Sequence, residues 1–207
     1  MKRSNRWLDE HFHDSYVKRA HRDKLPARSV YKLSEIDAAE HLIQPNMAIV
    51  DLGSSPGGWS TYIKSRLSAR GQLWALDILP MPVIHGVNFL QGDFNDPEVV
   101  EQLIQQLNGR EIDLVCSDMA PNISGINEYD QLRSLQLAEQ ALRFACHVLK
   151  YNGTLLIKLF QGNSTDQYRQ QIGQHFKRSK ILKPPASRAR SKELFLLASG
   201  FTRPTST

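Results

Sequence analysis

Short apolar segments alternate with longer amphipathic segments along most of this chain. The apolar segments have the length and composition of buried strands. They occupy residues 47–53, 72–78, 87–93, 112–119 and 153–160. Between the third and fourth of them, a segment of helical periodicity opens with Asp96 and Pro97 and closes on Gly109, which are start and stop signals of a helix. Such alternation predicts a parallel sheet with helices on both faces.

The end of the chain breaks this alternation. Residues 179–201 comprise an apolar run, a Pro-rich basic loop and a second apolar run, without a helical pattern between the two runs. Two strands joined in this way pair antiparallel. We therefore expect an α/β protein with the Rossmann-like class I S-adenosylmethionine-dependent methyltransferase fold, in which a mostly parallel seven-stranded sheet has its last strand antiparallel. Dinucleotide dehydrogenases lack that final strand arrangement.

A glycine-containing turn follows the first predicted strand, within the sequence IVDLGSSPGGWSTYI at residues 49–63. Its spacing differs from the G-x-G-x-x-G fingerprint that places a dinucleotide pyrophosphate on a helix N-terminus. Gly57 and Gly58 allow the backbone to pass close to a bulky, less anionic group, such as the methionine part of S-adenosylmethionine. Trp59 either packs against the cofactor or fills the core. The turn favours S-adenosylmethionine over NAD.

Acidic residues lie at the ends of three successive strands. Asp51 ends the first strand, Asp77 lies near the end of the second, and Asp93 ends the third. Ligands of parallel α/β sheets bind at this carboxyl edge. A carboxylate after the second strand can accept two hydrogen bonds from ribose hydroxyls, and Asp93 can accept from an adenine amino group. The three acids strengthen the prediction of a nucleoside-containing cofactor.

Two charged residues farther along the chain belong to the same edge. Asp118 ends the fourth strand, and Lys158 interrupts an otherwise continuous apolar strand. A lysine there is unfavourable unless it is paired or opens on a cleft. The loop DMAP lacks the Asn/Asp-Pro-Pro-aromatic sequence of exocyclic-amine methylases, and Cys116 lies within a strand rather than in a loop, where a cytosine-C5 mechanism needs a nucleophile. Both kinds of base methylation are therefore disfavoured.

Basic residues concentrate near the two ends of the chain. Residues 1–32 hold nine Lys/Arg and four Asp/Glu, and residues 177–192 hold seven Lys/Arg and no acid. Together these segments predict either a polyanion-binding surface assembled from both ends or solvated faces that favour solubility. Charge alone does not choose between them.

No segment indicates a membrane or secreted protein. No apolar run approaches the roughly 20 residues of a membrane span, and the N-terminus lacks the apolar core of a signal peptide. The two cysteines, Cys116 and Cys146, do not suggest a disulfide framework. We therefore expect a cytoplasmic protein without membrane contact.

Five segments of the chain resemble, in order, consecutive motifs of the FtsJ/RrmJ family of ribosomal RNA large-subunit 2′-O-methyltransferases. They are PARSVYKLSEID, VDLGSSPGGWS, DMAPNISG, GTLLIKLFQG and KPPASRARSKE. The resemblance implies a catalytic tetrad at Lys32, Asp118, Lys158 and Glu193. It also implies cofactor contacts at Gly57, Trp59, Asp77, Asp93 and Asp118. The family commonly has alanines where this chain has the serines of GSSPGG, a departure that leaves the tetrad untouched.

The resemblance also implies an activity. It is the S-adenosylmethionine-dependent methylation of the 2′-hydroxyl of a uridine ribose in 23S ribosomal RNA of the large subunit, with Lys158 as the proton acceptor. We expect a monomer that needs no metal, with a basic extension at 1–26 that contacts RNA and a single methyltransferase domain at 27–207. The alternatives are 2′-O-methylation of another RNA such as tRNA, a non-catalytic RNA-binding module, and an NAD-dependent dehydrogenase.

Overall fold

The fold is taken from a computed structural model of the chain. It describes residues 15–23, 25–121, 127–162, 164–188 and 191–202. Residues 1–14 of the expected N-terminal extension lie outside the described residues, and so does Arg190 of the basic loop.

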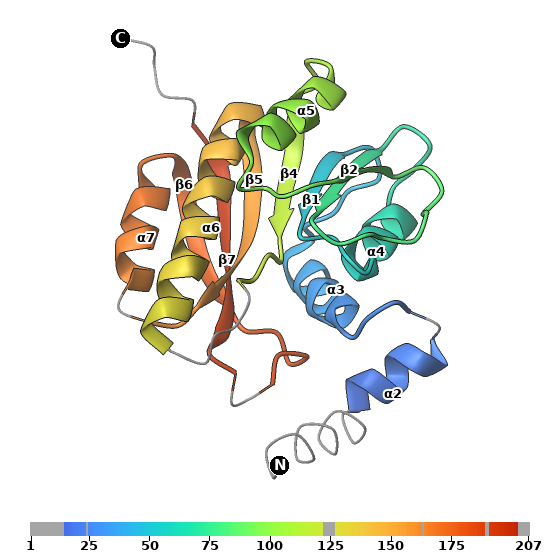
Figure 1. The fold of residues 1–207 in the computed structure, drawn as a ribbon, viewed down its shortest axis with the longest axis horizontal. Helices are drawn as coiled ribbons and strands as arrows, with labels where there is room; N and C mark the ends of the chain where they lie inside the picture. Colours follow the sequence, from blue (N-terminus) through green and yellow to red (C-terminus); the bar gives the residue numbers. More distant parts are fainter. Residues whose placement is uncertain (1–14, 24, 122–126, 163, 189–190, 203–207) are drawn as a thin grey trace.

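One seven-stranded sheet runs through the centre of the protein (Figure 1), with the strand order β3-β2-β1-β4-β5-β7-β6. The strands are β1 (Ala48–Leu52), β2 (Gln72–Asp77), β3 (Asn88–Gln91), β4 (Ile112–Ser117), β5 (Leu149–Phe160), β6 (Phe176–Leu182) and β7 (Glu193–Phe201). Strands β1 to β5 pair in parallel, whereas β7 is antiparallel to both β5 and β6. The predicted fold, with its antiparallel last strand, is confirmed.

Helices cover both faces of the sheet (Figure 1). One face carries α5 (Pro97–Leu107), α6 (Asn127–Val148) and α7 (Ser164–Gly173), and the other carries α3 (Ser29–Glu40) and α4 (Gly58–Arg66). Successive strand residues point to opposite faces, so the central strands contribute side chains to two separate apolar clusters. Their sequences therefore read as continuous apolar runs. Within the described ranges, no helix is both long and apolar enough to cross a membrane.

Some element boundaries differ from the prediction. Strand β5 begins at Leu149 rather than at residue 153, because Leu149 pairs with Ile112 ahead of a register shift between β4 and β5. Helix α7 ends at Gly173, whereas the sequence TDQYRQQIGQHF predicts a helix over residues 165–176. Phe176 instead pairs with Phe201, and their ring centroids lie 5.4 Å apart. Pairing with a distant strand, rather than the local sequence pattern, therefore determines where β5 begins and where α7 ends.

An additional helix, α2 (Ser15–Arg22), lies in the described part of the N-terminal extension. Its residues Val17 and Ala20 are buried. Ala20 packs in a small apolar cluster with Tyr31 of α3 and with Ala186, which lies between β6 and β7. The helix therefore joins two segments far apart in sequence.

Candidate active site

Strand register puts Lys158 and Glu193 on the same face of the sheet. Phe160 of β5 is the partner of Glu193 in β7, and Lys158 is the partner of Phe195. Opposed residues of an antiparallel pair point to the same side, and the direction repeats at every second residue. Phe195 belongs to the apolar cluster under α3 and α4. All four side chains therefore point toward α3.

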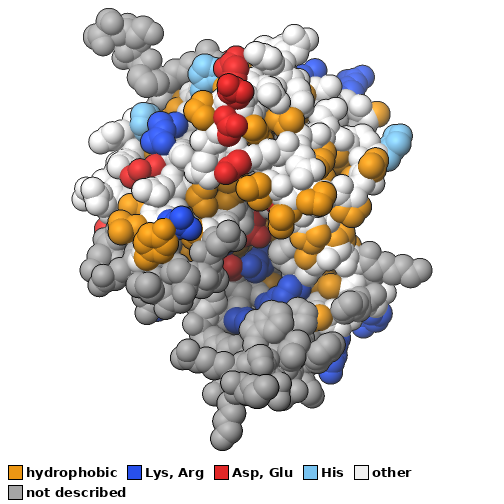
Figure 2. Space-filling model, viewed as in Figure 1, with side chains coloured by type: hydrophobic (Ala, Val, Ile, Leu, Met, Phe, Trp, Pro, Cys, Tyr) orange, Lys and Arg blue, Asp and Glu red, His pale blue; other side chains and the backbone are white. Residues whose placement is uncertain are grey.

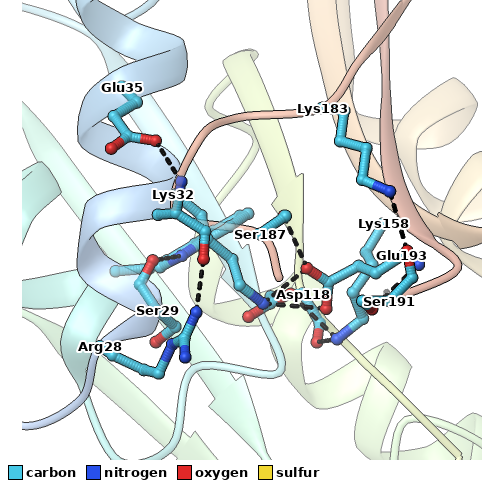
Figure 3. Close-up of polar contacts among 12 residues, drawn as sticks. Arg28, Ser29, Lys32, Glu35, Asp118, Lys158, Lys183, Ser187, Ser191 and Glu193 are labelled. Carbon is cyan, nitrogen blue, oxygen red and sulfur yellow. Dashed lines mark hydrogen bonds and ion pairs between the residues drawn. The ribbon is translucent and has the colours of Figure 1, made fainter. Parts of the chain in front are cut away.

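Lys32 reaches Glu193 from the first turn of α3 (Figure 3). Its Nζ lies 2.7 Å from Oε1 and 2.8 Å from Oε2 of Glu193. The two side chains are only 14% and 13% exposed. Lys32 Nζ also lies 5.9 Å from the ring centroid of Phe195. Because the pair is largely shielded from water, salt screens it less than it screens a surface ion pair.

Asp118 holds Lys158 from the loop that follows β4. Lys158 Nζ lies 2.9 Å from Asp118 Oδ1, and it also donates a hydrogen bond to the backbone carbonyl of Asp118. The amide of Asp118 donates to the carbonyl of Leu52 at 3.0 Å, so the end of β1 fixes this loop. Lys158 is buried, and a buried ammonium group requires such partners.

Glu193 links the two ion pairs electrostatically. Burial disfavours its charged form, but the ammonium groups of Lys32 and Lys158 hold the pKa of Glu193 below its ordinary value. Ser187 Oγ donates to Glu193 Oε1 at 3.0 Å. The structure thus brings together all four residues that the resemblance assigns to a tetrad (Figure 3).

The face of the protein drawn in Figure 2 has a hollow and is partly apolar. Figure 2 shows acidic and basic side chains meeting in a hollow, with apolar side chains exposed on both sides of it. Large exposed apolar side chains come from the segment after β2 and from the first turns of α6. They include Ile78, Leu79, Val83, Tyr129 and Leu132.

The glycine turn between β1 and α4 lies against the loop that carries Asp118. The amides of Gly53 and Ser54 donate to the carbonyl of Leu76 at 2.8 and 3.2 Å. Gly53 has φ +79°, and a Cβ there would lie 2.8 Å from the backbone nitrogen of Met119. Only glycine tolerates both this backbone conformation and this close approach. The turn and the Asp118 loop are therefore in direct contact.

Two of the three acids at the strand ends remain open to a ligand. Asp77 accepts hydrogen bonds from the amides of Ser55 and Leu79, both at 2.8 Å. Asp93 is exposed and accepts from the amide and the side chain of Asn95 at 2.9 and 2.7 Å. A carboxylate has about four acceptor sites, so both groups can still bind hydroxyl or amino donors.

Asp51 differs from the other two acids because it is fully buried. Its Oδ2 accepts a hydrogen bond from Ser60 Oγ at 2.6 Å, whereas its Oδ1 has no hydrogen-bond partner among the described residues. Burial raises the pKa of Asp51 to about 7, and the charges of Asp118 and Asp77 add to this, against the bond from Ser60. The structure therefore separates Asp51 from the residues that a ligand can touch.

Trp59 places its side chain in the core. The residue is 2% exposed, and its Nε1 donates to the carbonyl of Ser29 at 2.9 Å. Its ring centroid lies 5.7 Å from that of Phe195. Its backbone amide belongs to the first turn of α4, where N–H groups lack partners within the helix. A cofactor contact at this position therefore involves the backbone rather than the indole.

Sequence reasoning missed three residues that surround the tetrad, namely Arg28, Glu35 and Ser187. All three lie inside segments that carry the family resemblance. Glu35 follows Lys32 by one helical turn, which is the one local signal that points to it. Among the described residues, no group of three or more His, Cys, Asp or Glu side chains is arranged to hold a metal ion.

Known proteins share this sequence and fold. The sequence profile of the FtsJ-like methyltransferases matches residues 25–201. Proteins of Marinobacter nauticus and Legionella pneumophila (strain Lens), both named ribosomal RNA large subunit methyltransferase E, are each 48% identical over 200 residues, covering 97% of both chains. A crystal structure of a Plasmodium falciparum protein assigned as a ribosomal RNA methyltransferase superposes with a TM-score of 0.77. It is 25% identical and covers 86% of this chain and 100% of its own.

Proposed function

The chain belongs to the FtsJ-like methyltransferase family, and from this premise we propose that it methylates the 2′-hydroxyl of a uridine ribose in 23S ribosomal RNA. The methyl donor is S-adenosylmethionine. The names of its relatives support ribosomal RNA of the large subunit as the substrate. The observation that carries the proposal is the convergence of the Lys158–Asp118 and Lys32–Glu193 pairs beside the glycine turn.

The residues around the glycine turn suit S-adenosylmethionine. The first turn of α4, including the amide of Trp59, offers N–H donors to a carboxylate. Asp77 and Asp93 offer acceptors to the ribose hydroxyls and the adenine amino group. Gly57 keeps the turn free of a side chain. Asp118 lies on the side of the site that faces the ribose hydroxyl to be methylated. The bound cofactor supplies a methyl group on a positively charged sulfur.

In the proposed mechanism, Lys158 first releases one proton of its ammonium group to solvent, and the neutral amine then accepts the proton of the ribose 2′-hydroxyl. A hydroxyl becomes an effective nucleophile as its proton leaves, and a positioned base accelerates such a step by roughly 10²–10⁴-fold. Asp118 orients Lys158 by accepting from its Nζ with both the carboxylate and the backbone carbonyl. Lys32 and Glu193 hold the ribose in place. Correct placement of the hydroxyl lowers the barrier further.

Variants at Lys158 test whether this residue is a base. Lys158→Ala and Lys158→Arg are assayed for methyl transfer to large-subunit particles, and cofactor affinity is measured by calorimetry. We expect both variants to lose transfer about 100-fold or more while cofactor binding persists, because arginine stays protonated and cannot act as a base. Near-normal transfer by Lys158→Arg would make Lys158 a polarising cation. Near-normal transfer by Lys158→Ala would remove it from the mechanism.

Lys150 offers a matched control for these variants. It belongs to the same strand and forms an ion pair with Asp113, but it lies at the other end of β5 and is 44% exposed. Lys150→Ala therefore removes a lysine–aspartate pair from β5 without touching the proposed site. We expect it to keep wild-type methyl transfer.

The placement of basic residues supports RNA as the partner. Helix α2 carries exposed Lys18 and Arg19, and it packs on α3, the helix that carries Lys32. We assign residues 1–26 to RNA contact and residues 27–207 to a single methyltransferase domain that acts as a cytoplasmic monomer. An alternative is 2′-O-methylation of another RNA such as tRNA.

Mapping of 2′-O-methyl groups identifies the substrate. RNA from a strain lacking the protein is compared with RNA from the parent strain, and the purified enzyme is offered assembled large subunits, free ribosomal RNA and tRNA. We expect one uridine of 23S ribosomal RNA to lose its methyl group in the deletion strain. A site lost from tRNA instead would establish the alternative.

A further inference from the structure

Glu35 lies where three separate segments of the chain meet. Its Oε1 accepts a hydrogen bond from the hydroxyl of Tyr16 in α2 at 2.9 Å. Its Oε2 accepts from the backbone amide of Ala186, in the Pro-rich segment between β6 and β7, at 2.7 Å. Because Glu35 belongs to α3, whose position beside Lys32 is seen in Figure 3, one carboxylate joins α2, α3 and this segment.

Ala186 is held from both sides of its backbone. Arg28 donates from Nη2 to the carbonyl of Ala186 at 2.5 Å, while Glu35 accepts from its amide. Ala186 itself is fully buried. Buried backbone polar groups require partners, and here both partners are side chains, one from the N-cap of α3 and one from the middle of that helix. The position of this turn therefore depends on Arg28 and Glu35.

The residue after this turn contacts the proposed active site. Ser187 is 7% exposed, and its hydroxyl donates to Glu193 Oε1 at 3.0 Å. Glu193 in turn binds Lys32, which lies one helical turn before Glu35 on α3. The contacts form a closed path from Glu35 through Ala186, Ser187 and Glu193 to Lys32 and back along the helix.

We propose that Glu35 is a positioning residue of the active site. By holding the amide of Ala186, it places Ser187 so that the serine hydroxyl fixes the carboxylate of Glu193 against Lys32. The bond from Tyr16 extends the same contact to α2. This role rests on the proposed function, because it concerns the geometry of residues that act in methyl transfer.

Two substitutions at Glu35 separate its acceptor role from its charge. Glu35→Ala leaves the buried amide of Ala186 without an acceptor, which is unfavourable enough to displace the turn. Glu35→Gln keeps one oxygen for that amide and an NH2 group that can donate to the hydroxyl oxygen of Tyr16. We expect Glu35→Ala to lower kcat about tenfold or more with unchanged affinity for S-adenosylmethionine. Glu35→Gln restores kcat.

Glu40 supplies the matched control on the same helix. Its carboxylate pairs with Lys180 at 2.6 Å, at the end of α3 that is farther from Lys32. Glu40→Ala removes an ion-paired carboxylate from α3 and is expected to leave kcat unchanged. Glu35→Asp is included in case Glu35→Ala does not fold, since the shorter side chain reaches the Ala186 amide less well.

A double-mutant cycle with Ser187→Ala tests the route through Ser187. If Glu35 acts through this hydroxyl, Glu35→Ala lowers kcat much less in the Ser187→Ala background than in the wild type. Loss of stability alone would not produce this coupling, because all assays are run well below the melting temperature of each variant. Amide hydrogen exchange at Ala186 is expected to be faster in Glu35→Ala than in the wild type.

The outcomes distinguish this proposal from the proposed function. Wild-type kcat in Glu35→Ala, or losses that are additive with Ser187→Ala, would overturn the positioning role while the methyltransferase activity stands. Absence of methyl transfer by the wild type itself would overturn the proposed function and, with it, this role. Faster exchange at Ala186, a low kcat and rescue by glutamine together support the role.

Discussion

Three aspartates at the carboxyl edge of this sheet differ in their surroundings. Asp77 and Asp93 retain acceptor sites for a ligand, whereas Asp51 is sealed in the core with Ser60. The difference arises from burial, which raises the pKa of Asp51 to about 7. A carboxyl group buried in this way makes the stability of the fold depend on pH.

The pKa of Asp51 sets the sign of this dependence. The ordinary value is 3.8 and the folded value is about 7, so the folded state binds the proton more tightly. Its contribution to the free energy of unfolding is full below pH 3.8 and is lost as the pH rises through about 7. Asp51→Asn cannot lose a proton, so it should gain stability relative to the wild type between pH 4 and 8.

Urea unfolding of both proteins across this pH range measures the effect. The difference corresponds to about 1.4 kcal/mol for each unit of pKa shift, and so to a few kcal/mol at most. Asp51→Asn also places an amide NH2 in the core, which adds a constant that does not vary with pH. Parallel stability curves for the two proteins would contradict the raised pKa.

At the scale of elements, the site depends on close contact between loops that follow different strands. The turn after β1 approaches the loop after β4 so closely that a Cβ at Gly53 would lie 2.8 Å from the nitrogen of Met119. Asp118 immediately precedes Met119. The glycine therefore allows the loop that carries a proposed catalytic residue to lie against the proposed cofactor turn.

Gly109 allows a matched measurement of this contact. It also has a positive φ, of +72°, but a Cβ there would meet nothing within 4 Å. Gly109→Ala should therefore lose only about 1 kcal/mol of stability, from the left-handed backbone conformation. Gly53→Ala should lose a further 1–3 kcal/mol or so from overpacking, and should bind S-adenosylmethionine more weakly. Equal losses in urea unfolding would show that the close contact is unimportant.

Contacts between elements also connect α2 to the proposed active site. Helix α2 buries Val17 and Ala20 and reaches Glu35 through Tyr16. The Pro-rich segment reaches the same carboxylate through Ala186. The described portions of both basic ends of the chain therefore meet on α3, the helix that carries Lys32.

At the scale of the whole molecule, charge is distributed unevenly along the chain. The basic ends meet near the proposed active site, whereas residues 33–176 hold nine Lys/Arg and sixteen Asp/Glu. A surface of this kind attracts polyanions over a distance and binds them in a salt-dependent way. Position, rather than total charge, should therefore determine the effect of a neutralised residue.

Lys18 and Arg70 test this expectation at equal change of net charge. Both are exposed, but Lys18 lies on α2, which packs on α3, whereas Arg70 lies just before β2, at the amino end of the parallel strands. Lys18→Gln should weaken RNA binding and reduce the slope of log K against log salt by about one, whereas Arg70→Gln should leave the slope unchanged. Fluorescence titrations with a ribosomal RNA fragment at several salt concentrations provide the measurement. The same loss for both variants would favour a general effect of charge.

Local patterns in the sequence were sufficient to predict most of the architecture. Continuous apolar runs indicated strands buried on both faces, and the two final runs without an intervening helix indicated the antiparallel strand. Lys158 was identified because burial of an unpaired ammonium group is unfavourable. The tetrad as a set came from the resemblance to a family, since no local pattern relates its members.

Tertiary structure decided which of these residues meet. Lys32 and Glu193 are 161 positions apart, and they pair only because the register of β5 with β7 turns Glu193 toward α3. Place in the sheet likewise exposes Asp93, which follows the edge strand β3, and buries Asp51, which lies within the central strand β1. Periodicity along a chain reports that a side chain is buried or exposed. It does not report which residue that side chain contacts, because such contacts are set by long-range strand pairing and packing. The sequence by itself therefore determined the fold and the edge at which we propose the chemistry, and the structure determined the contacts there.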